Sequence, residues 1–115
     1  MKKDDRVYLA HMRDAMNRIV EYTACDKRDF MANHMAQDAV VRQFEILGEA
    51  AKRVSESFRL SHPEVPWSDM ARLRDKSIHD YMGISIEMFW VFSKDNVRPD
   101  LERIIGILKI LGEPE

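Results

Sequence analysis

The stretch VVRQFEILGEAAKRVSESF, residues 40–58, decides the fold class of this chain. Its apolar residues recur at intervals of four and three, which places them on one side of an α-helix and predicts a long amphipathic helix. These positions are Val40, Phe44, Leu47, Ala51, Val54 and Phe58. Gly48 lies inside the pattern, although glycine costs about 1 kcal/mol relative to alanine within a helix. We therefore expect another backbone to cross this helix closely at residues 48–51.

A further helix is predicted on the N-terminal side of this stretch. Its apolar residues follow the same spacing, at Tyr8, Met12, Ala15, Ile19 and Tyr22. The polar residues 25–29 then interrupt the pattern, which predicts a break between the two helices.

Prolines mark the C-terminal end of the long helix. Pro63 and Pro66 each disfavour a helical backbone in the residue before them, so a loop is expected over residues 60–67. Because proline is tolerated in the first turn of a helix, the next helix should begin near Pro66 or Trp67. Its apolar pattern predicts that it runs to about Asp80.

Two more helical segments are expected after residue 80. Residues 82–85, MGIS, supply a glycine stop and then Ser85 as the N-cap of a helix that opens at Ile86. Residues 95–99, DNVRP, should interrupt or kink this helix, since an interior proline removes a backbone hydrogen bond. The apolar pattern then resumes at Val97, Leu101, Ile104, Leu108 and Leu111.

Four long helical segments with short connections and no strand pattern predict an all-α, antiparallel bundle of four to five helices. At 115 residues the chain has the usual size of one domain, so we expect a single domain over residues 1–115. Ile105, Ile107 and Ile110 leave apolar surface beside the main stripe, which favours a homodimer.

Composition argues against several classes of protein. With 33% charged residues, the chain has no apolar run that could span a membrane, and its N-terminus lacks the apolar stretch of a secretory signal. Cys25 is the only cysteine, so no intrachain disulfide is expected and a cytoplasmic location fits best. The formal charge of −2 argues against a broad basic surface for duplex DNA, but not against a short RNA held locally.

Residues 74–81, RDKSIHDY, combine a cation, an imidazole and a phenol near a predicted helix end. Arg74 can hold a phosphate through two parallel hydrogen bonds and stabilise the charge that develops when a phosphodiester is attacked. His79 can move a proton near neutral pH. The pair suits metal-free cleavage of RNA, in which the 2'-hydroxyl of the substrate attacks the adjacent phosphate.

The spacing of this pair limits how it can act. Five residues correspond to about 140° around a helix, so Arg74 and His79 do not share one face. They can converge if the helix tightens at its end, if Arg74 reaches around, or if a dimer completes the site, and we favour the last two. The structural interpretation makes Arg74 an exposed salt-bridge residue and His79 a polar residue that closes a helix.

The same stretch resembles the RxxxxHxY signature of the HepT family, a branch of the HEPN superfamily, with matches at Arg74, His79 and Tyr81. The resemblance extends to YLAHM at residues 8–12, QFEILGEAAKR at residues 43–53 and HPEVPW at residues 62–67. Ser77 departs from the aliphatic residue expected inside the signature.

This resemblance implies an all-helical homodimer with an RNase cleft at the dimer interface, acting as the toxin of a toxin–antitoxin pair. Arg74 and His79 would be catalytic, and Asp75 would support the site. The partner would be an MNT-type nucleotidyltransferase antitoxin that transfers AMP from ATP to Tyr81. The attached nucleotide would block RNA by its bulk and negative charge.

No metal or cofactor is expected. His11, His34 and His62 lack metal-ligand spacing and are interpreted as surface or capping residues, and no glycine-rich phosphate loop is present. The alternative function is a non-catalytic helical adaptor that binds and regulates a nucleotidyltransferase.

Overall fold

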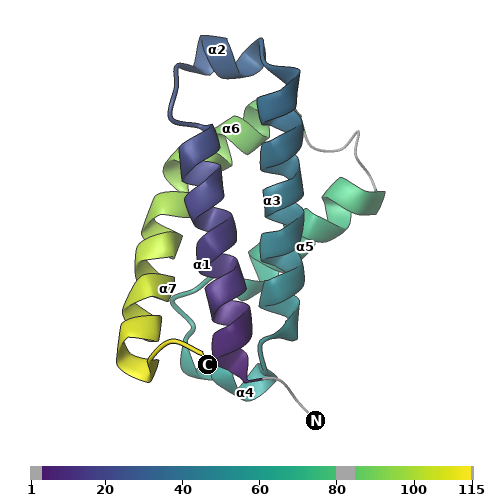
Figure 1. Cartoon of the computed structure of the whole chain (residues 1–115). Coiled ribbons are helices and arrows are strands. Elements are labelled where there is room, and N and C mark those ends of the chain that lie inside the picture. The colour runs from purple at the N-terminus through teal and green to yellow at the C-terminus, as the bar shows by residue number, and fades with distance from the viewer. Residues whose placement is uncertain (1–3, 80–84, 115) are drawn as a thin grey trace.

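The computed structural model describes residues 4–79 and 85–114, with the side chains of residues 75–79 left aside. Helices joined by loops make up this part of the chain, which contains no strand, and this confirms the all-α prediction (Figure 1). Five segments are long, and two are short. The helices are α1 (Asp5–Tyr22), α2 (Lys27–Met31), α3 (His34–Arg53), α4 (Glu56–Ser61), α5 (Trp67–His79), α6 (Ile86–Asp95) and α7 (Val97–Leu111).

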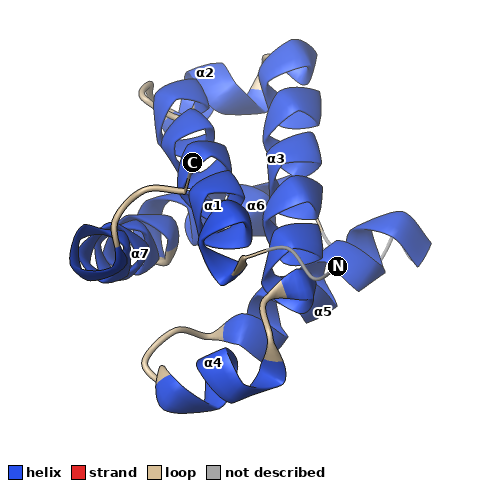
Figure 2. Ribbon diagram, turned by 60° about the horizontal axis from the view of Figure 1, so that its bottom comes forward, coloured by secondary structure: helices blue, strands red, loops and turns tan. Residues whose placement is uncertain are grey.

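The antiparallel helices α1 and α3 form the centre of the bundle (Figure 1). Helix α7 packs against the other side of α1, and α5 crosses α3 on the side away from α1, as Figure 2 shows from the end of the bundle. The short helices α2 and α4 lie at opposite ends of α3, while α6 contacts α2 and α7. The described helices include no apolar stretch with the length of a membrane span.

The predicted apolar stripes form the core. Leu9, Met12, Met16 and Ile19 on α1 are fully buried, as is Val40 on α3. Burying a large aliphatic side chain contributes about 1.5–3 kcal/mol, so these facing stripes are the main source of stability. The other buried members of the α3 stripe are Phe44, Leu47, Ala51 and Val54, and α7 adds Val97, Leu101, Ile104, Ile107 and Leu108.

The prediction of one continuous helix from Val40 to Phe58 was wrong. Helix α3 ends at Arg53, and Val54 is extended with ψ of 137°. Ser55 then caps α4 by accepting a hydrogen bond from the Phe58 amide. The Asp5 carboxylate accepts bonds from the Ser55 amide at 2.8 Å and from its hydroxyl at 2.7 Å. The amide and the hydroxyl of Ser55 thus have hydrogen-bond partners without a continuous helix, and the apolar spacing alone could not reveal this.

The predicted break over residues 25–29 is also partly wrong, because α2 begins at Lys27. Its Phe30 is fully buried and packs against Trp90, with ring centroids 5.1 Å apart. One apolar anchor therefore orders a turn of helix within a polar stretch.

The expected helix start at Trp67, the cap at Ser85 and the interruption within residues 95–99 are confirmed. Helix α5 begins at Trp67, and Ser85 caps α6 by accepting a 3.2 Å bond from the Met88 amide. Helix α6 ends at Asp95 and Pro99 falls in the first turn of α7, where its missing amide costs little. The expected glycine stop lies in residues 82–84, outside the described residues.

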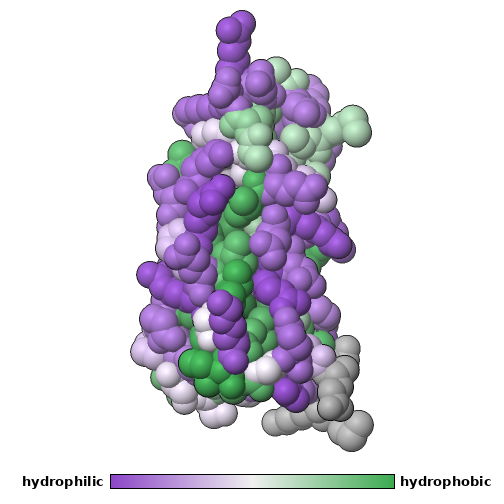
Figure 3. All heavy atoms as spheres, turned by 60° about the vertical axis from the view of Figure 1, so that its left-hand side comes forward, coloured by the Kyte–Doolittle hydropathy of each residue, from purple (hydrophilic) through white to green (hydrophobic). Residues whose placement is uncertain are grey.

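The apolar surface expected on α7 is smaller than its sequence indicates. Ile107 is buried and Ile105 is half-buried, whereas Ile110 is 87% exposed. Figure 3 shows a narrow apolar strip between hydrophilic side chains on the side of the molecule that carries α7. A homodimer remains a prediction.

Candidate functional site

The candidate site begins at the crossing of α3 and α5. A Cβ atom at Gly48 would lie 2.6 Å from the carbonyl oxygen of Met70 and closer still to the Cβ of Arg74. Real Cβ atoms do not approach neighbours this closely, so only glycine permits the two helices to meet here. This confirms the close crossing predicted at residues 48–51 and places the stem of Arg74 directly against α3.

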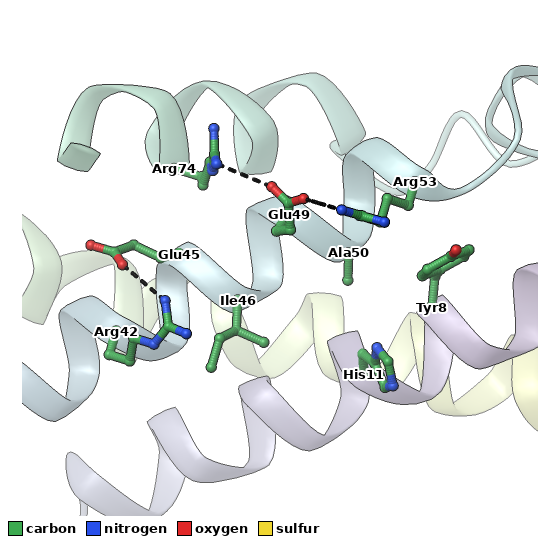
Figure 4. Close-up of a pocket in the computed structure, with 9 residues that line it drawn as sticks. All are labelled: Tyr8, His11, Arg42, Glu45, Ile46, Glu49, Ala50, Arg53 and Arg74. Carbon is green, nitrogen blue, oxygen red and sulfur yellow. Dashed lines mark hydrogen bonds and ion pairs between the residues drawn. The ribbon is translucent and has the colours of Figure 1, made fainter. Parts of the chain in front are cut away.

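The Glu49 carboxylate holds Arg74 at this crossing. Arg74 Nη2 lies 3.2 Å from Glu49 Oε2, and the arginine side chain is only 24% exposed. The other oxygen, Oε1, accepts a hydrogen bond from Arg53 Nε at 3.0 Å and forms an ion pair with Arg53 Nη2 at 2.9 Å. One carboxylate therefore joins two arginines from different helices (Figure 4).

This pairing also sets the charge of Glu49. The hydrogen bond from Arg53 lowers the pKa of Glu49 below its ordinary value, and the positive charges of Arg74, Arg53 and Lys52 lower it further. Burial raises the pKa of Glu49, but by less than the hydrogen bond from Arg53 lowers it. Glu49 is thus an anion at neutral pH, as an orienting partner for a guanidinium must be.

A pocket of about 380 Å³ lies between α1 and α3, with Arg74 at its edge (Figure 4). Tyr8 and His11 approach it from α1, and their rings meet edge to face with centroids 6.3 Å apart. Helix α3 contributes apolar side chains at Ile46 and Ala50. The charged residues along its α3 side are Arg42, Glu45, Glu49 and Arg53.

The structure describes the predicted site residues in different detail. Arg74 is fully described, whereas for Asp75 and His79 only the position on α5 is given, and Tyr81 lies outside the described residues. Helix α5 is α-helical to His79. Arg74 and His79 therefore stay about 140° apart around the helix, and tightening of its end does not bring them together.

Sequence analysis missed Glu49, Tyr8 and His11. The Glu49–Arg53 spacing of four residues next to Gly48 is a signal for a helix ion pair beside the crossing. No comparable signal shows that Tyr8 and His11 face α3, because this depends on how α1 packs. His34 is exposed at the start of α3, and His62 stacks on Phe58 at a centroid distance of 4.5 Å, as expected for surface residues.

Comparison with known proteins agrees with the family resemblance in the sequence. A family model described as "Ribonuclease HepT-like" matches residues 12–107. The chain is 41% identical to "Putative RNase MJ0127" of Methanocaldococcus jannaschii, over 99% of this chain and 96% of the relative. It is 39% identical to "Probable ribonuclease HepT" of Thermococcus cleftensis, over 84% of this chain and 89% of the relative.

A third relative carries the same region within a longer protein. "Gamma-glutamylcyclotransferase and putative RNase MJ0434" of Methanocaldococcus jannaschii is 36% identical over 98% of this chain but only 51% of its own length. No solved structure matches this chain at a significant level.

Proposed function

Because the chain belongs to the HepT-like ribonuclease family, we propose that it is a metal-independent endoribonuclease that acts through Arg74 and His79. The observation that carries the proposal is the placement of Arg74. Its guanidinium is held by Glu49 at the edge of a pocket, and Gly48 lets α5 approach closely enough for this contact. An arginine fixed at a pocket edge suits a phosphate better than a freely moving surface arginine does.

In the proposed reaction the nucleophile comes from the substrate. The 2'-hydroxyl oxygen attacks the adjacent phosphorus, and the bond to the 5'-oxygen of the next nucleotide breaks. The products are a 2',3'-cyclic phosphate and a 5'-hydroxyl. His79 transfers the proton, Arg74 stabilises the charge on the phosphate oxygens, and Asp75 supports the pair.

The geometry of α5 favours a site built from two copies of the chain. Within one helix the positions of Arg74 and His79 are about 140° apart around the axis. A homodimer in which the two α5 helices meet would instead bring Arg74 of one subunit close to His79 of the other. Each chain would act as one domain, consistent with a relative in which this region is joined to a different activity.

Regulation would come from a nucleotidyltransferase antitoxin of the MNT type. The Tyr81 hydroxyl would attack the α-phosphorus of ATP, so that AMP is attached and pyrophosphate leaves. Tyr81 is two residues from His79 in the sequence, so the added nucleotide would cover the site with bulk and negative charge.

The test compares the parent, His79→Ala and His34→Ala on single-stranded RNA in EDTA, with folding checked by circular dichroism. His34 is exposed at the start of α3 and serves as the matched control. The parent and His34→Ala should leave 2',3'-cyclic phosphate ends, while His79→Ala should cut at least about 100-fold more slowly. Equal cleavage by His79→Ala would contradict the assignment. No cleavage by any form, with binding of the nucleotidyltransferase intact, would favour the helical adaptor.

A further inference from the structure

The pocket between α1 and α3 is larger than the phosphate contact at Arg74 requires. Its volume of about 380 Å³ lies within the roughly 300–1,000 Å³ of small-ligand pockets. We propose that it binds one nucleotide of the RNA substrate, next to the phosphate that is cut. This inference rests on the proposed ribonuclease function.

The aromatic side of the pocket suits a nucleobase. Tyr8 is half-buried and His11 is exposed, and their rings lie at 84° to one another, so together they form a corner. Ile46 and Ala50 present an apolar surface from α3. Unpaired RNA bases are held by stacking on aromatic rings and by contact with apolar side chains, in a way that tolerates different bases.

The charged side of the pocket suits the sugar–phosphate backbone. Three arginines, Arg42, Arg53 and Arg74, face two carboxylates, which leaves a net charge of one positive among these five groups. The Arg42 side chain is 68% exposed, so it can turn toward a phosphate without leaving a buried group unsatisfied. Arg53 is 59% exposed and adds its positive charge while it stays paired with Glu49. The pocket thus has cations at one side and rings at the other.

The pocket is continuous with the candidate catalytic arginine. Glu49 contacts both Arg53 and Arg74, so the two guanidinium groups lie on either side of one carboxylate. A nucleotide whose base rests on Tyr8 and His11 would place its phosphate near Arg53 and the neighbouring phosphate near Arg74. This arrangement gives single-stranded RNA a defined path to the site, which duplex RNA cannot follow because its bases are stacked.

The first test measures binding without cleavage. AMP, CMP, GMP and UMP are titrated separately into the parent protein, and the imidazole C–H signals are followed by NMR after assignment with His→Ala variants. The His11 signals should shift and saturate with each nucleotide, while the His34 signals should not move. Inorganic phosphate alone should shift His11 much less. Equal shifts with phosphate would overturn a base-binding role.

The second test separates binding from chemistry during cleavage of a single-stranded oligoribonucleotide. His11→Ala should raise KM about fivefold or more and change kcat less, as expected when one base contact is lost. His11→Phe keeps a flat ring and should restore most of the affinity, and His34→Ala should behave as the parent. An unchanged KM in His11→Ala would overturn the inference.

The two tests fail differently. Cleavage by the parent with no His11 shift and no KM effect would remove the nucleotide subsite and leave the ribonuclease proposal standing. Shifts at His11 without RNA cleavage by any form would contradict the proposed ribonuclease reaction. The pocket would then be a nucleotide-binding site without that activity.

Discussion

Two of the described helices carry an interior glycine, and the surroundings of these glycines differ completely. At Gly48 in α3 a Cβ atom would collide with the backbone of α5, whereas at Gly106 in α7 it would meet no described heavy atom within 4 Å apart from its chain neighbours and the backbone of its own helix. Both residues weaken their helices by a similar amount in isolation. Of the two, only Gly48 is required by a close contact, because it allows Arg74 to pack directly against α3.

The contacts that stabilise the fold are therefore not the same as the contacts that position the candidate site. Helices α1 and α3 contact each other and carry large buried side chains, such as Leu9 and Leu47, that belong to the hydrophobic core. The crossing of α3 and α5 at Gly48 instead brings two backbones together beside a chain of charged groups. Changes at the crossing should therefore affect activity more than their cost in stability indicates.

The largest effect is expected from Gly48→Ala. The new methyl group must push α5 away from α3, which should lower the free energy of unfolding by about 2–3 kcal/mol. It should also reduce RNA cleavage by the molecules that remain folded, because Arg74 moves away from Glu49. Urea unfolding followed by circular dichroism, at one fixed protein concentration, measures the first effect.

Gly106→Ala is the matched control for that substitution. Its methyl group enters open space and should raise the free energy of unfolding by about 0.5–1 kcal/mol, since alanine is the better helix former. If the two glycine variants changed stability alike, the contrast between the crossing and α7 would not hold.

A smaller loss of stability, but a clear loss of activity, is expected from Glu49→Gln. The pairs that Glu49 makes are partly exposed, so the free energy of unfolding should fall by no more than about 1 kcal/mol. The kcat for RNA cleavage should fall about tenfold or more, because Arg74 loses the charged partner that orients it. Cleavage assays that are quenched at fixed times under saturating RNA measure this kcat.

Glu87→Gln provides the comparison for Glu49→Gln. Glu87 pairs with Lys27 at 2.5 Å, between α6 and α2 and away from the pocket. Its loss should leave kcat unchanged. A similar fall in kcat in both variants would show that Glu49 acts through general stability and not through Arg74.

The smallest effects are opposite pH dependences at two carboxyl groups. Hydrogen bonding by Arg53 lowers the pKa of Glu49, so its contribution to stability is present above about pH 4.5 and is lost as the pH falls through the folded pKa. Burial raises the pKa of Asp100, despite its 2.7 Å contact with Arg103. Its contribution is therefore greatest at low pH and is lost as the pH rises through the folded pKa.

Unfolding measured between pH 3 and pH 7 can separate these two carboxyl groups. The stability of the parent relative to Glu49→Gln should increase with pH, whereas its stability relative to Asp100→Asn should decrease. Slopes of the same sign would contradict the different environments of the two groups.

The sequence predicted the long helices well because their stability depends on apolar spacing, which is a local property. It failed at Val54, whose apolar side chain continues the stripe although the backbone there is already extended. The deciding partner of the next residue, Ser55, is Asp5, which is fifty residues away. Long-range hydrogen bonds of this kind leave no periodic pattern.

The same distinction holds for the candidate site. Arg74 was identified from its motif, and Gly48 from the cost of glycine inside a helix. The carboxylate that holds Arg74 and the rings of Tyr8 and His11 emerged only when three helices were packed together. Motifs thus located one group of the site, while its shape depended on tertiary structure.

The sharing of Glu49 between two arginines has a consequence for substrate exchange. If Arg74 turns to a substrate phosphate, as the proposed function requires, Glu49 can keep its two contacts with Arg53, at 3.0 Å and 2.9 Å. No carboxylate is then left without a cation, so the transfer of Arg74 costs little. After release of the product, Glu49 would attract Arg74 back to the position that it has in the structure. The protein thereby keeps its arginine oriented at rest and yet available, with Arg53 acting as a permanent counterion.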